Sequence, residues 1–171
     1  MISTRVQALL FSLLVFATVS AAQDKPAVDT PQDAKSLAPG VVERGNPAMG
    51  FDQNKTTHHF LLRDDGGVIQ VTINHPSDVA DLNMIRKHLA HIALAFSNGD
   101  FNIPMLVHDR VPPGVPVMKA SKSKIHYRYE ELDGGGRVVI ESRDARAILA
   151  VHEFLRFQIR EHATSDPLKI D

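Results

Sequence analysis

The pattern of apolar positions predicts two amphipathic helices. In residues 81–96 and again in residues 143–161, apolar side chains recur at intervals of three and four, which places them on one face of a helix. The first face consists of Leu82, Ile85, Leu89, Ile92 and Phe96, and the second consists of Ile148, Val151, Leu155 and Ile159, flanked by Phe154 and Phe157. Gly99 is a stop signal, so we expect the first helix to end near residues 97–99.

Four short runs with alternating or continuous apolar residues predict β-strands. They span residues 57–63, 68–73, 124–132 and 137–141. Glycine-containing acidic turns separate the first run from the second and the third from the fourth, which is typical of hairpins. Between the first helix and the third strand, residues 100–122 contain four prolines and break the pattern. Within this connection we expect only a short edge strand at 103–107.

The order of these elements indicates the fold class. A strand, an acidic glycine turn, a second strand and a helix occur twice, so we predict a duplicated β-β-α unit. Such a unit gives an α+β fold with a four-stranded antiparallel sheet and two helices on one face. In the repeat His91 matches His152, and we expect these two histidines to lie at similar depths against the sheet.

The first 22 residues have the pattern of a signal peptide. Arg5 precedes the apolar run 8–19, and small residues at 20–22 offer a cleavage site. The run is short for a membrane span, which makes an uncleaved anchor the less favoured alternative. We therefore expect a periplasmic or secreted protein without a membrane span after cleavage.

Composition divides the rest of the chain. Residues 23–48 are rich in proline, alanine and charged residues without periodicity, which predicts a flexible linker. We expect a single α+β domain over 49–165 and a frayed tail over 166–171. The chain has no cysteine, which excludes disulfides and thiolate metal sites. Its 19 Lys and Arg against 20 Asp and Glu give no electrostatic basis for binding nucleic acid. The sequence leaves the oligomeric state open.

The nine histidines, all between residues 58 and 162, are the candidate chemistry. Neutral imidazoles are good ligands for copper and zinc, and three of them suffice for an open site. Strand parity places His58 on the helix side of the sheet, whereas His88 and His91 share one edge of the first helix. The first candidate metal site is therefore His58, His88, His91 and His152. The second, with two members on the open face of the sheet, is His59, His126 and His108.

Three functions remain open. The first is an exported protein that binds Cu or Zn through histidines. The second is a non-metal ligand- or protein-binding module of the cell envelope, in which the same histidines are solvated or hydrogen-bonded side chains. The third is a small periplasmic enzyme with His108–Asp109 or His152–Glu153 in acid–base roles. We rank the enzyme last, because residue 156 is Arg, so the zincin motif fails, and no nucleophile motif is present.

Overall fold

The structure, a computed structural model, describes residues 37–170. The predicted signal peptide and most of the predicted linker lie outside the described residues. The described residues belong to one compact unit of the chain.

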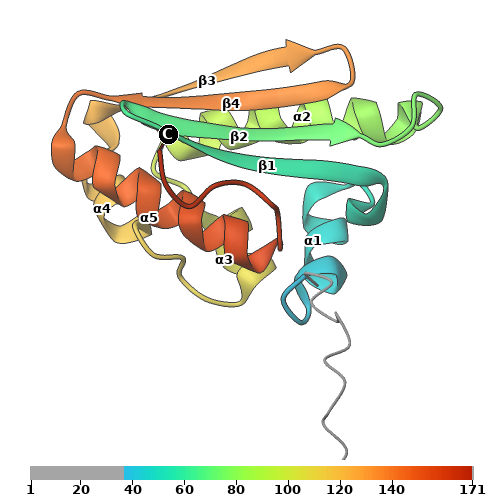
Figure 1. Cartoon of the computed structure of the whole chain (residues 1–171), viewed down its shortest axis with the longest axis horizontal. Coiled ribbons are helices and arrows are strands. Elements are labelled where there is room, and N and C mark those ends of the chain that lie inside the picture. The colour runs from blue at the N-terminus through green and yellow to red at the C-terminus, as the bar shows by residue number, and fades with distance from the viewer. Residues whose placement is uncertain (1–36, 171) are drawn as a thin grey trace, which may run out of the picture. The chain divides into compact units, whose positions relative to one another are not determined.

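A four-stranded antiparallel sheet forms one layer of this unit (Figure 1). Its strands are β1 (Thr56–Arg63), β2 (Gly66–Ile73), β3 (Ile125–Leu132) and β4 (Gly135–Ser142). The order is β1-β2-β4-β3, so each predicted hairpin is present and the two hairpins join along β2 and β4. The predicted α+β fold with an antiparallel four-stranded sheet is therefore confirmed, whereas the duplication stays a prediction.

Glycines at the starts of β2 and β4 allow the hairpins to join. A Cβ on Gly66 would lie 2.2 Å from the carbonyl oxygen of Ile140, and one on Gly135 would lie 2.0 Å from that of Val71. Real Cβ atoms do not approach so closely, so any other residue there would push the two central strands apart.

Two long helices bury their apolar stripes against the sheet. They are α2 (Val79–Ser97) and α5 (Ala145–Glu161). Leu89 of α2 lies beside Gly136, and Leu155 of α5 lies beside Gly67. Both leucines are almost fully buried, and each contributes about 2 kcal/mol of hydrophobic stabilisation. The sheet face that they contact carries Phe60 and, in register with it, Ile69 and Val138.

The proline-rich connection is helical, so the predicted strand at 103–107 is wrong. It contains α3 (Asn102–His108) and α4 (Val115–Ala120), followed by the single-turn helix η2 (Lys122–Lys124). Pro104 and Pro116 stand in first turns, where the missing N–H costs no hydrogen bond and the fixed φ favours a helix. Proline therefore starts these helices rather than excluding them.

The domain also extends beyond both predicted limits. Helix α1 (Val41–Met49) and the single-turn helix η1 (Gln53–Lys55) begin inside and just after the predicted linker. Long-range bonds hold α1, because Arg44 Nε donates to the Val107 carbonyl at 2.9 Å and Gln53 Nε2 donates to the Val41 carbonyl at 3.1 Å. The predicted frayed tail is likewise anchored, since Asp166 accepts a 2.9 Å bond from the Phe60 N–H.

Candidate functional site

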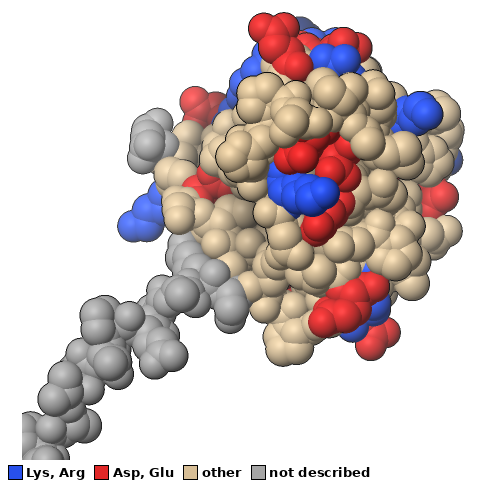
Figure 2. Space-filling model, turned by 90° about the vertical axis from the view of Figure 1, so that its right-hand side faces the viewer, with Lys and Arg blue, Asp and Glu red and all other residues tan. Residues whose placement is uncertain are grey.

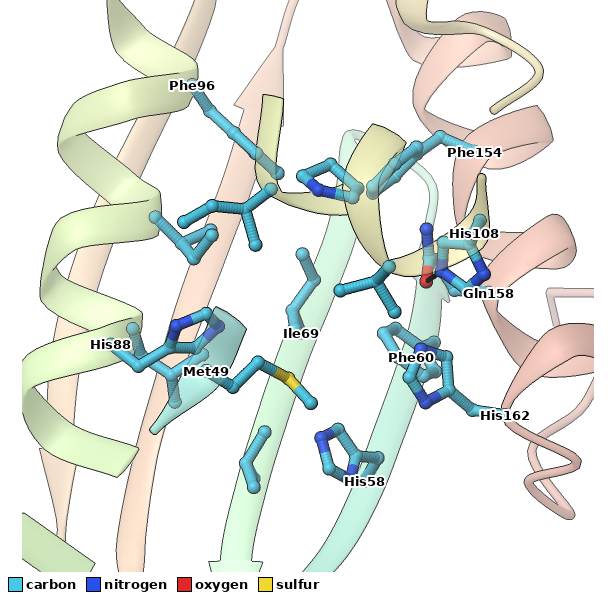
Figure 3. Close-up of a pocket in the computed structure, with 16 residues that line it drawn as sticks. Met49, His58, Phe60, Ile69, His88, Phe96, His108, Phe154, Gln158 and His162 are labelled. Atoms are coloured by element: carbon cyan, nitrogen blue, oxygen red, sulfur yellow. Dashed lines mark hydrogen bonds between the residues drawn. The ribbon is translucent and has the colours of Figure 1, made fainter. Parts of the chain in front are cut away.

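A small cavity lies between the sheet and the helices α1, α2, α3 and α5 (Figure 3). Its volume is about 60 Å³, and its walls are mainly apolar. Four histidines reach it from four different segments, and we call this space the imidazole pocket. The residues that line it include Met49, His58, His88, His108, Gln158 and His162.

Strand β1 supplies His58. Its side chain shares the helix-facing side with Phe60, because residues two apart on a strand point the same way. The ring stacks on Phe51 at 6.0 Å between centroids, and the buried Nε2 has no hydrogen-bond partner. Burial, together with the neighbouring His88 and His59, lowers the pKa of His58 to about 4. The ring is therefore neutral at pH 7.

Helix α2 supplies His88 at the border of its apolar stripe. The ring meets the edge of Phe51, with centroids 5.6 Å apart. Burial lowers the pKa of His88 to about 4, and the neighbouring His91 contributes a smaller part of this shift. This second imidazole is also neutral at pH 7, and Figure 3 shows it across the pocket from His58.

The C-terminal end of α5 supplies His162. Its ring stacks on His58 with centroids 5.2 Å apart and an interplanar angle of 21°, and it also contacts Phe60. The buried Nδ1 has no hydrogen-bond partner. Burial and the two neighbouring imidazoles, His58 and His108, hold the pKa of His162 well below its ordinary value. His162, at the C-terminal cap of α5, therefore lines the pocket.

Helix α3 supplies His108, which is fixed by α5. Its Nε2 donates a 2.8 Å bond to Gln158 Oε1, and its Nδ1 lies 3.6 Å from a Glu161 carboxylate oxygen. The ring centroid is 5.2 Å from that of His162 in an edge-on arrangement. Burial lowers the pKa of His108, and the interactions with Gln158 and Glu161 oppose part of this shift. These contacts hold the His108 ring in place beside His162.

The structure brings together only two members of the first predicted metal site, His58 and His88. His91 is exposed, although it lies one turn from His88. His152 is 5% exposed, and its Nε2 bonds to the Arg63 carbonyl at 2.9 Å, which ties α5 to the end of β1. The expectation that His91 and His152 lie at similar depths is therefore wrong.

The members of the second predicted site stay apart. His59 is on β1 and His126 is on β3, the two edge strands, with two strands and about 14 Å of sheet between them. His59 pairs with Asp166 at 2.8 Å, and His126 is exposed. His108 lies under the opposite face of the sheet, in the imidazole pocket. The sheet therefore separates it from the other two.

The acid–base pairs expected from adjacent residues do not form. His108 turns to Gln158 and Glu161, whereas Asp109, in a left-handed conformation with φ of 52°, is exposed. His152 is buried and Glu153 is exposed. Within residues 37–170 no group of three or more His, Cys, Asp or Glu side chains is arranged as a metal site.

Two pocket residues were missed from the sequence, His162 and Met49. A signal for His162 exists, because it continues the apolar stripe of α5 at helical spacing from Leu155 and Ile159. Met49 offered none, since its helix lies in a segment without apolar periodicity.

Comparison of the chain with known protein families, with curated proteins and with solved structures finds no match. Across residues 37–170 no helix has the length and apolar character needed to cross a bilayer.

Proposed function

We propose that this protein is an exported binding protein that takes up a transition metal ion, copper or zinc, in the imidazole pocket. One observation carries the proposal. Among residues 37–170, His58 Nε2 and His162 Nδ1 are buried without a hydrogen-bond partner, on rings whose centroids are 5.2 Å apart. Two imidazoles that share one metal ion have centroids about 5 to 6 Å apart, because each nitrogen lies about 2 Å from the metal. Modest rotation of the rings about χ2, a broad torsion, would aim both nitrogens at one ion.

The size of the pocket favours an ion over an organic ligand. Pockets for drug-sized ligands measure roughly 300 Å³ or more. A cavity of about 60 Å³ holds about four water molecules, or an ion with part of its hydration. Buried polar atoms normally have a bonding partner, so unpartnered polar atoms in such a space favour a small polar ligand.

The charge state of the histidines also favours a metal. A metal ion binds the lone pair of an unprotonated imidazole, so protons compete with it. Because burial lowers the pKa of His58 to about 4 and holds that of His162 well below its ordinary value, this competition is negligible at pH 7.

Equilibrium dialysis against micromolar Cu or Zn, followed by elemental analysis, tests the proposal. We expect one ion per chain, and we expect it to be lost in His58→Gln and in His162→Gln. His91→Gln and His126→Gln serve as matched controls, because both histidines are exposed and outside the pocket. Absence of metal from the unaltered protein, or equal loss in the controls, would refute the proposal.

A non-metal binding module is the second candidate, and one observation favours it. A hollow of about 750 Å³ surrounds His126 on the open side of the sheet, with Lys124, Arg143 and Glu141 among its walls. On a different face, shown in Figure 2, acidic and basic groups lie beside one another among neutral side chains. Because the hollow itself is lined by both basic and acidic side chains, its ligand would need both donors and acceptors. Chemical shift changes confined to this hollow on adding a zwitterionic peptide library would support this candidate.

A further inference from the structure

The imidazole pocket contains a sulfur atom from a helix that the sequence did not predict. Met49 is the last residue of α1 and is 8% exposed. Gly50 follows it in a left-handed conformation with φ of 80°, which turns the chain so that Phe51 packs on His58. Figure 3 shows the Met49 thioether directed into the space between His88 and His58. A thioether and the unpartnered nitrogens of His58 and His162 therefore share one small cavity. A third unpartnered imidazole nitrogen, His108 Nδ1, lies 3.6 Å from the Glu161 carboxylate.

The chemistry of this set distinguishes between metal ions. Thioether sulfur is a soft ligand that selects Cu(I), whereas Zn²⁺ and Cu²⁺ gain little from it. In the described part of the chain, residues 37–170, no carboxylate lines the pocket, and Glu161, which lies 3.6 Å from His108 Nδ1, is paired with Arg110. Burying a divalent ion among neutral ligands costs roughly four times as much as burying a monovalent one, because the Born energy grows with the square of the charge.

We infer, on the basis of the proposed function, that the pocket is a Cu(I) site whose ligands are His58, His162 and Met49. His108 holds the His162 side of the wall through its bond to Gln158, and Phe51 supports the His58 ring. Such a two-nitrogen, one-sulfur set is compatible with the lack of a ready-made group of three His, Cys, Asp or Glu side chains among residues 37–170, because methionine supplies the third ligand.

Competition between the purified protein and bicinchoninate for Cu(I), under a reductant, tests the inference. We expect one Cu(I) per chain and at least tenfold weaker binding in Met49→Leu, which keeps the volume and removes the sulfur. Met118→Leu is the matched control, because Met118 is fully buried outside the pocket. It should bind Cu(I) as the unaltered protein does.

X-ray absorption of the copper-loaded unaltered protein gives a readout that needs no variant. The chain has no cysteine, so a copper–sulfur shell can come only from methionine. Absence of that shell, or equal Cu(I) affinity in Met49→Leu and Met118→Leu, would overturn the inference. Stoichiometric Zn²⁺ or Cu²⁺ without Cu(I) would also overturn it while leaving the proposed function intact. No binding of any of these ions would remove both.

Discussion

The buried neutral histidines should make the metal-free protein unusually sensitive to mild acid. His58 and His88 have a pKa of about 4 in the folded protein, against about 6.5 in an unfolded chain. As the pH falls below about 6.5, the unfolded chain takes up protons that the folded protein cannot accept until about pH 4. Stability is therefore lost through this window and is fully present above it.

The size of the effect follows from the two pKa values. Between pH 7 and pH 5, linkage gives a loss of about 1.8 kcal/mol for each histidine, or about 3.6 kcal/mol for the pair. No acidic side chain lines the pocket to offset this, since the groups facing His58 are the imidazoles of His88 on α2 and His162 after α5. A typical domain has only about 5–15 kcal/mol of stability, so the loss is a large fraction of the total.

Urea unfolding followed by far-UV circular dichroism, with a chelator present, measures this loss directly. Because His162 is held neutral as well, we expect the free energy of unfolding to fall by at least about 3.6 kcal/mol from pH 7 to pH 5, and His88→Gln to reduce that fall by about 1.8 kcal/mol. His126→Gln, an exposed control, should leave it unchanged. A fall below about 1 kcal/mol in the unaltered protein, or the same fall in His88→Gln, would show that the histidines are not held neutral by burial.

Three further predictions concern the parts of the fold that frame the pocket. Gly114→Ala should cost at least about 2 kcal/mol in thermal unfolding, because φ is 82° and a Cβ would lie 2.0 Å from a carbonyl oxygen of α5. Gly99→Ala, at a φ of 77° where a Cβ would make only an ordinary 3.4 Å contact with Lys122 Cδ, should cost about 1 kcal/mol. Asp166→Asn should cost about 1 kcal/mol and speed amide exchange along β1, because Asp166 accepts bonds from the His59 ring and the β1 backbone; unchanged exchange would refute this anchor. Gln53→Leu should cost about 1–3 kcal/mol and raise amide exchange selectively in α1, since the Gln53 side chain is buried and bonds to that helix; equal exchange in α2 and α1 would contradict it.

The sequence by itself determined the sheet, the long helices and the inward side of β1. Apolar periodicity fixes these because an element must bury whichever face is hydrophobic. Strand parity alone separates His58, which enters the pocket, from the neighbouring His59, which does not. The acidic glycine turns likewise indicated both hairpins, and only their order in the sheet needed the structure.

Tertiary packing decided which histidines meet. Two side chains three residues apart on a helix point in directions that differ by about 300° around its axis. The rotation of α2 on the sheet therefore places His88 at the pocket and His91 in solvent. Helix α1 contains glycine and proline, and its bonds to Gln53 and Val107 come from residues distant in sequence. Local propensity could not predict a helix whose stability comes from such contacts. For that reason Met49 and its sulfur became visible only in the folded chain.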